Sequence, residues 1–89
     1  MIKHIIVKGK VQGVSFRYYT VKEAKSKALL GTVKNRPDGD VEIFISGSSV
    51  KLEEFEKWCR IGSPFSTVNQ VISEIVSDHI NFSDFKIIY

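Results

Sequence analysis

The sequence has a single cysteine, Cys59, and two histidines, His4 and His79, among its 89 residues. One cysteine excludes an intramolecular disulfide and favours a reducing, cytoplasmic setting. The three residues lie far apart in sequence, so a zinc site built from them is not expected.

Long apolar runs are also missing. No stretch approaches the roughly 18 residues needed to cross a bilayer, and residues 1–8 are too few and too charged for a signal peptide. The excess of one sign of charge is small, because 13 basic residues stand against 10 acidic ones, for a net charge of +3. This balance is compatible with an anionic partner, but a solvated, slightly basic surface explains it equally well. We expect no membrane contact.

The remaining composition is that of an ordinary folded protein, with 43% hydrophobic and 26% charged residues. The length suits one domain, so residues 1–89 are assigned to a single unit. No internal repeat, low-complexity tract or linker interrupts it.

The first third of the chain predicts a strand followed by a helix. Residues 2–10 are rich in Ile and Val and too short for a typical helix, which favours a strand. From about residue 15 to residue 30 the apolar spacing becomes helical, and Gly31 is expected to end that helix. Its buried face is predicted from positions i, i+3 and i+7, which are Val21, Ala24 and Ala28.

The middle of the chain predicts a β-hairpin. Residues 32–36 and 41–45 are strand-like, and they flank Pro37-Asp38-Gly39-Asp40, a sequence typical of a turn. A second helix is predicted to begin at residues 47–49 and to end at Gly62, since Pro64 cannot continue it.

A long strand is predicted over residues 68–76, and residues 85–89 could add a short one. The resulting order, β-α-β-β-α-β, is that of the ferredoxin-like α+β sandwich, with two helices on one face of a mainly antiparallel sheet of order 4-1-3-2. The first and second strands then run parallel with the third between them. The loop after the first strand and the end of the second strand, with Asn35 and Arg36, therefore meet at one edge.

The loop from Gly9 to Arg17 has the features of an anion site. Glycines allow a ligand to approach the backbone closely, and successive N–H groups ahead of a helix N-terminus attract negative charge. The planar guanidinium of Arg17 matches phosphate oxygens. The endings of a P-loop and of a dinucleotide-binding motif are both missing. From spacing alone, an anion site and a tight turn with a surface arginine are equally supported.

A family resemblance favours the first interpretation. Residues 7–17, Val-Lys-Gly-Lys-Val-Gln-Gly-Val-Ser-Phe-Arg, resemble the signature of the acylphosphatase family, and residues 31–35 followed by Asp38-Gly39 are similar to its second signature. Further matches are Phe55, Trp58, Gly62-Ser63-Pro64 and the ending Phe85-Lys86-Ile87-Ile88-Tyr89. The likeness covers nearly the whole chain in the correct order.

The resemblance implies hydrolysis of the carboxyl-phosphate bond of acyl phosphates, which yields a carboxylate and inorganic phosphate. It further implies that Arg17 binds the phosphoryl group, that Asn35 holds the attacking water, and that neither a metal, a cofactor nor a covalent enzyme intermediate takes part. The backbone amides expected to share the phosphate are those of Gln12, Gly13, Val14, Ser15, Phe16 and Arg17. We expect a monomer acting on a small molecule.

The residue types fit this chemistry. The loop has no Asp, Cys or His to act as a nucleophile, and Ser15 has no evident base beside it. A carboxylate leaves readily, so positioning and charge stabilisation are the means that remain. An asparagine such as Asn35 is a poor base, so we hypothesise that a phosphate oxygen of the substrate takes the proton of the water.

Two other functions share this fold. An RNA-recognition module would need paired aromatic residues on the central strands, and the first strand has none, so no nucleic-acid partner is expected. A catalytically silent, ligand-binding regulatory module is the second alternative. The joint presence of Arg17 and Asn35 argues against it.

Several residues carry simpler expectations. Cys59, Phe55 and Trp58 are expected in the core. Thr32 replaces a tryptophan common in the family, which we expect to affect packing beside the second strand more than the reaction class. The basic residues Lys10, Lys34 and Arg36 could strengthen the positive field at the site or could simply be solvated.

Overall fold

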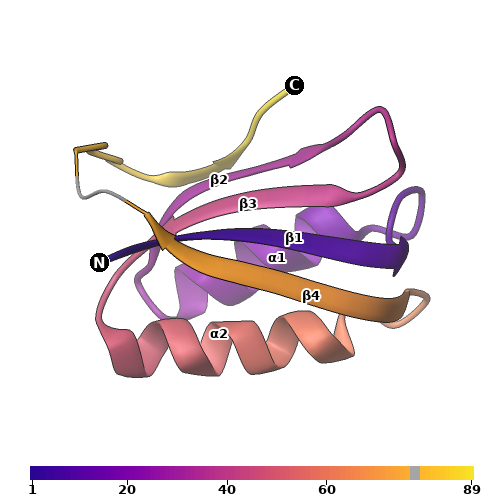
Figure 1. The fold of residues 1–89 in the computed structure, drawn as a ribbon, viewed down its shortest axis with the longest axis horizontal. Helices are drawn as coiled ribbons and strands as arrows, with labels where there is room; N and C mark the ends of the chain where they lie inside the picture. Colours follow the sequence, from indigo (N-terminus) through magenta and orange to yellow (C-terminus); the bar gives the residue numbers. More distant parts are fainter. Residues whose placement is uncertain (77–78) are drawn as a thin grey trace.

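The computed structural model describes residues 1–76 and 79–89. Its elements follow the predicted order and add a short final strand: β1 (Ile2–Lys10), α1 (Phe16–Ser26), β2 (Leu30–Asn35), β3 (Val41–Ser46), α2 (Ser49–Ile61), β4 (Thr67–Val76) and β5 (Phe85–Ile87). The strands form one sheet in the order β4-β1-β3-β2-β5, and both helices pack on the same face of it (Figure 1). The ferredoxin-like α+β prediction is confirmed.

The pairing of the strands explains how the two predicted halves of the site come together. β3 pairs antiparallel with both β1 and β2, so β1 and β2 run parallel without touching in the sheet. β5 adds a parallel partner to β2, with Val33 opposite Ile87. The loop after β1 and the hairpin turn between β2 and β3 therefore lie at the same end of the molecule (Figure 1).

The core lies between the sheet and the helices. Alternate residues of β1 and β3, such as Val7 and Ile43, are fully buried against it. Helix α2 contributes Phe55 and Cys59, both fully buried, and Trp58 packs against the same cluster. The three α2 residues are core, as predicted. Burial raises the pKa of the Cys59 thiol, which keeps it protonated and inert.

The end of α1 differs from the prediction. The helix stops at Ser26 rather than continuing to residue 30, and Ala28 takes a left-handed φ of 55°. The N–H of Leu29 then donates to the carbonyl of Ala24 at 2.9 Å, the long closing bond of a Schellman motif. The predicted face was wrong in one member, because Ala28 lies beyond the helix and is exposed.

Gly31 was predicted to end α1 but lies inside β2, which begins at Leu30. Its φ of 152° disfavours other residues, and a Cβ at this position would collide with the backbone carbonyl of Phe44 on β3. The glycine is thus explained by strand-to-strand contact and not by helix termination.

The ends of α2 match the prediction. Ser48 precedes the helix, and its hydroxyl accepts a hydrogen bond from the N–H of Lys51 at 3.3 Å. Gly62 follows the helix with a φ of 78° and donates its N–H to the carbonyl of Trp58. Both termini are therefore set by local sequence.

Glu56 of α2 joins the helix to the edge of the sheet. Its carboxylate accepts hydrogen bonds from Lys3 on β1 at 3.0 Å and from Ser73 on β4 at 2.7 Å. Burial alone would raise the pKa of Glu56, but these two hydrogen bonds and the charges of Lys3 and Arg60 outweigh it. The pKa of Glu56 consequently lies below its ordinary value of 4.5.

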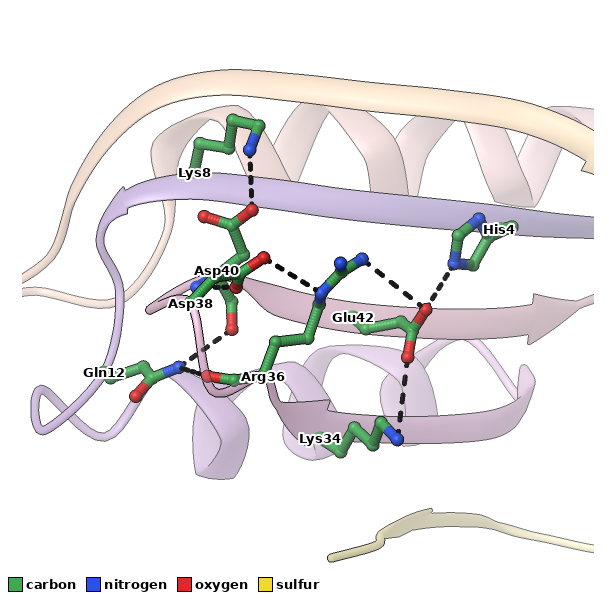
Figure 2. A network of polar contacts seen from close by, with 8 residues as sticks. All are labelled: His4, Lys8, Gln12, Lys34, Arg36, Asp38, Asp40 and Glu42. Atoms are coloured by element: carbon green, nitrogen blue, oxygen red, sulfur yellow. Dashed lines mark hydrogen bonds and ion pairs between the residues drawn. The ribbon is translucent and has the colours of Figure 1, made fainter.

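In the parts of the chain that the structure describes, residues 1–76 and 79–89, no helix covers the other face of the sheet (Figure 1). It carries His4, whose ring lies 4.5 Å from that of Phe44 and whose Nε2 is 2.7 Å from Glu42 (Figure 2). Thr32 is paired with Phe44 across the strands, and its effect on packing stays a prediction. Within residues 1–76 and 79–89, neither helix is long and apolar enough to span a membrane.

Candidate active site

The backbone between β1 and α1 is shaped for close approach of a ligand. Gly13 and Ser15 both have left-handed conformations, with φ of 71° and 59°. A Cβ on Gly13 would meet no atom within 4 Å, so the space beside its backbone is open. Left-handed residues within a short loop turn successive N–H groups toward one concavity, the arrangement of an anion-binding nest. Ser15 accepts a local strain of about 1–2 kcal/mol to take this shape.

Helix α1 begins in this loop with its positive end uncompensated. Ser15 is the N-cap, yet its side chain makes no capping hydrogen bond. The first turn contains no acidic residue. The amides of that turn, which have no partner inside a helix, therefore remain free to bind an anion, and the helix dipole adds to the attraction.

Arg17 lies in this first turn and is partly buried. Within the described parts of the chain it forms no ion pair with a carboxylate, and its guanidinium lies 5.4 Å from the ring centroid of Tyr89. A guanidinium that contacts an aromatic ring but has no acidic partner can use its N–H groups to bind phosphate oxygens.

Asn35 is the last residue of β2. Its side-chain Oδ1 is buried and, among the described residues, has no hydrogen-bond partner. Leaving such an acceptor unpaired costs about 1–3 kcal/mol. An acceptor held at this cost is suited to a hydrogen bond from a water molecule or a ligand.

Arg17 and Asn35 face one cavity of about 340 Å³. Its full lining is Val11, Gly13, Ser15, Phe16, Arg17, Tyr18, Asn35 and Ile87. The predicted loop residues Gly13, Ser15 and Phe16 thus lie beside the two predicted catalytic residues. The cavity is thus bordered by the loop between β1 and α1, by Arg17 and by Asn35.

Two predicted phosphate-binding residues lie next to this lining without belonging to it. The carbonyl of Val14, itself buried, accepts a hydrogen bond from the hydroxyl of Ser63 at 2.8 Å. The side chain of Gln12 donates to the carbonyls of Arg36 and Asp40 at the β2–β3 turn (Figure 2). Gly9, taken as the start of the loop, belongs to β1 at a bulge where a side chain would collide with the carbonyl of Thr67.

Three cavity residues were not predicted from the sequence. Val11 and Tyr18 flank the residues that were singled out, and nothing in their types marks them as ligands. Ile87 reaches the site through the parallel pairing of β5 with β2, a tertiary contact that no local pattern announces. All three residues carry apolar atoms and line the cavity.

The neighbouring basic residues are largely occupied elsewhere. Arg36 pairs with Asp38 at 3.3 Å and lies 3.9 Å from Glu42, and Lys34 also lies 3.9 Å from Glu42 (Figure 2). These contacts are on the hairpin, outside the cavity lining. The structure thus favours a surface role for Lys34 and Arg36.

The electrostatics of the cavity consequently come mainly from Arg17 and the start of α1. In residues 1–76 and 79–89 there is no group of three or more His, Cys, Asp and Glu residues that could hold a metal ion.

Comparison with known proteins identifies the family. The acylphosphatase family model matches residues 3–87. The chain belongs to the acylphosphatase family. A curated acylphosphatase from Bacillus licheniformis is 46% identical over 85 residues, which are 96% of this chain and 94% of that relative. One from Pasteurella multocida is 41% identical over 87 residues, covering 98% and 97%.

The fold agrees with that of solved acylphosphatases. The crystal structure of the enzyme from Bacillus subtilis superimposes with a TM-score of 0.86 at 41% identity, over the full length of both chains. The resemblance deduced from residues 7–17 and 31–39 is therefore confirmed at the level of the family and of the fold. Most of the cavity lining, namely Val11, Gly13, Ser15, Phe16, Arg17 and Asn35, lies in the two segments that carry those motifs.

Proposed function

We propose that this protein hydrolyses acyl phosphates to a carboxylate and inorganic phosphate, and that Arg17 and Asn35 are its catalytic residues. The observation that carries the proposal is their presence in the lining of one cavity, Arg17 in the first turn of α1 and Asn35 at the end of β2. Membership of the acylphosphatase family supports the reaction class.

The phosphoryl group binds to the backbone amides of residues 12–17 and to the guanidinium of Arg17. In a loose transition state, negative charge spreads over the three equatorial oxygens of the transferring group. Donors that are already in place when this charge develops stabilise it without reorganisation. Gly13 and the uncapped start of α1 supply such donors.

Asn35 orients the attacking water through its side-chain amide, which borders the cavity. The water oxygen forms a bond to phosphorus, the bond between phosphorus and the carboxyl oxygen breaks, and the carboxylate leaves with the bonding electron pair. A phosphate oxygen takes the proton of the water, because an amide is too weak a base. Positioning of the water is the main contribution of Asn35.

The apolar groups of Val11, Tyr18 and Ile87, which also line the cavity, are available to contact the acyl group. We also propose that the active form is a monomer. We further propose that the protein acts in the cytoplasm and needs no metal.

Turnover of benzoyl phosphate in the presence of EDTA tests the proposal. Hydrolysis in water labelled with ¹⁸O should place one labelled oxygen in inorganic phosphate and none in benzoate, because attack occurs at phosphorus. Label in the benzoate would overturn the mechanism. Binding of inorganic phosphate without turnover of benzoyl phosphate would favour the catalytically silent module.

A further inference from the structure

Gln12 connects the two segments that form the site. It lies in the loop that follows β1, and its side-chain Nε2 donates to the carbonyl of Arg36 at 2.8 Å and to that of Asp40 at 2.9 Å (Figure 2). These two carbonyls flank the β2–β3 turn. Both hydrogens of one amide group are thereby used on the backbone of a segment 24 residues or more away in sequence.

The turn that receives these bonds is itself well ordered by hydrogen bonding. The N–H of Arg36 donates to the carbonyl of Asp40 at 2.8 Å, and the N–H of Gly39 donates to the carbonyl of Arg36 at 3.1 Å. Each carbonyl has two lone pairs, so it can also accept from Gln12. Gln12 therefore binds a turn whose shape is already fixed and takes its own position from it.

The sheet supplies no such connection. β1 and β2 are separated by β3, so no ladder hydrogen bond runs between the strand before the loop and the strand that ends at Asn35. Gln12 directly precedes Gly13 of the cradle, and Arg36 directly follows Asn35. The hydrogen bond from Gln12 to the carbonyl of Arg36 thus joins the phosphate loop to the residue that follows Asn35, and the bond to Asp40 holds the other end of the same turn.

We infer that Gln12 is a positioning residue that fixes the phosphate loop relative to Asn35, and so sets the water on line with the bound phosphoryl group. The inference rests on the proposed function for its catalytic consequence. A positioning role differs from a purely structural role because it predicts that a Gln12 variant loses more turnover than phosphate binding. A misplacement of about 1 Å can lower a rate by about 10²-fold.

A matched control is available on the same turn. Lys8 of β1 contacts Asp40 through an ion pair of 2.7 Å, and its side chain is 42% exposed. The variant Lys8→Met removes a contact to the turn without touching the loop. The variant Gln12→Met keeps an unbranched side chain of similar length and removes both donors.

We expect Gln12→Met to lower kcat by about 10- to 100-fold, while the inhibition constant of inorganic phosphate changes by less than about threefold. Lys8→Met should leave kcat within about twofold of the wild type. Equal kcat values in wild type and Gln12→Met would overturn the inference, and so would a phosphate affinity that falls in proportion to kcat. Thermal melts of both variants show that each is folded.

A double-mutant cycle tests the connection to Asn35. If Gln12 acts through Asn35, Gln12→Met should cost less than about threefold in kcat once Asn35→Ala is present, because coupled residues are not additive. The full single-mutant loss in that background would contradict the inference.

A readout without turnover separates this inference from the proposed function. With isotope-labelled protein, Gln12→Met should shift the side-chain amide resonances of Asn35, and Lys8→Met should leave them in place. An inactive wild type would refute the proposed function while this measurement still decides the contact role of Gln12. Unchanged Asn35 resonances in Gln12→Met would refute the positioning role.

Discussion

Replacing Asn35 by leucine should separate the stability of the protein from its activity. Leucine has the same branching and nearly the same size, so it fits where the side chain of Asn35 borders the cavity. The substitution removes the buried Oδ1 that has no partner among the described residues. An unpaired buried acceptor costs about 1–3 kcal/mol, so the variant should unfold with an equal or greater free energy than the wild type.

The expected gain is about 1 kcal/mol, which corresponds to a rise in Tm of about 4–8 °C for a domain of this size. The same variant should lose about 10²-fold or more in kcat, because the water is no longer oriented. Urea denaturation and benzoyl phosphate turnover measure the two effects. Asn69→Leu, at an exposed position of β4, controls for the general effect of leucine in a strand. A variant of Asn35 that loses more than about 1 kcal/mol of stability yet keeps its kcat would refute this reasoning.

Three further predictions concern stability. Ala28→Gly should raise the free energy of unfolding by about 0.5–1 kcal/mol. The relief of left-handed strain, about 1–2 kcal/mol, is larger than the free-energy cost of the added entropy of the unfolded chain. A variant that is less stable than the wild type in urea melts would contradict the Schellman assignment. Gly31→Ala should lower the free energy of unfolding by more than about 3 kcal/mol, because its Cβ collides with the Phe44 carbonyl. Gly13→Ala has open space for its Cβ, so it should lose only the backbone strain of about 1–2 kcal/mol. Equal losses for the two variants in thermal melts would show that the collision is relieved. The pKa of Glu56 is lowered in the folded protein, so its carboxylate stabilises the fold fully above the ordinary pKa of 4.5, and this stabilisation is lost as the pH falls through the folded pKa. The difference in free energy of unfolding between wild type and Glu56→Gln should therefore disappear in acid. A difference that does not change with pH would contradict a stabilising role of the Glu56 charge.

Much of the fold could be predicted because local patterns and topology agree. The alternation of Val41, Ile43 and Ile45 indicated the inward face of β3, and the hairpin followed from the Asp-Gly turn. Once the order of elements was known, the parallel course of β1 and β2 brought the loop and Asn35 to the same end.

The errors arose where tertiary contacts outweigh local preference. The end of α1 is set by a left-handed Ala28, where sequence rules favour glycine, so Gly31 was mistaken for the terminator. The role of the Gln12 side chain depends on two carbonyls across the molecule. Ile87 enters the cavity through strand pairing alone. No local periodic pattern in the sequence predicts any of these three features.

The central claim is that Arg17, supported by the start of α1, stabilises a phosphoryl group during attack by water. The most direct test is the hydrolysis of benzoyl phosphate, with EDTA present, by wild type, Arg17→Gln and Arg60→Gln. Arg60 is an exposed arginine of α2 that contacts Glu56 and controls for the loss of one positive charge. We predict rapid turnover by the wild type and by Arg60→Gln, with a loss of at least about 10²–10³-fold in kcat for Arg17→Gln. Turnover by Arg17→Gln at the rate of the wild type would contradict the account.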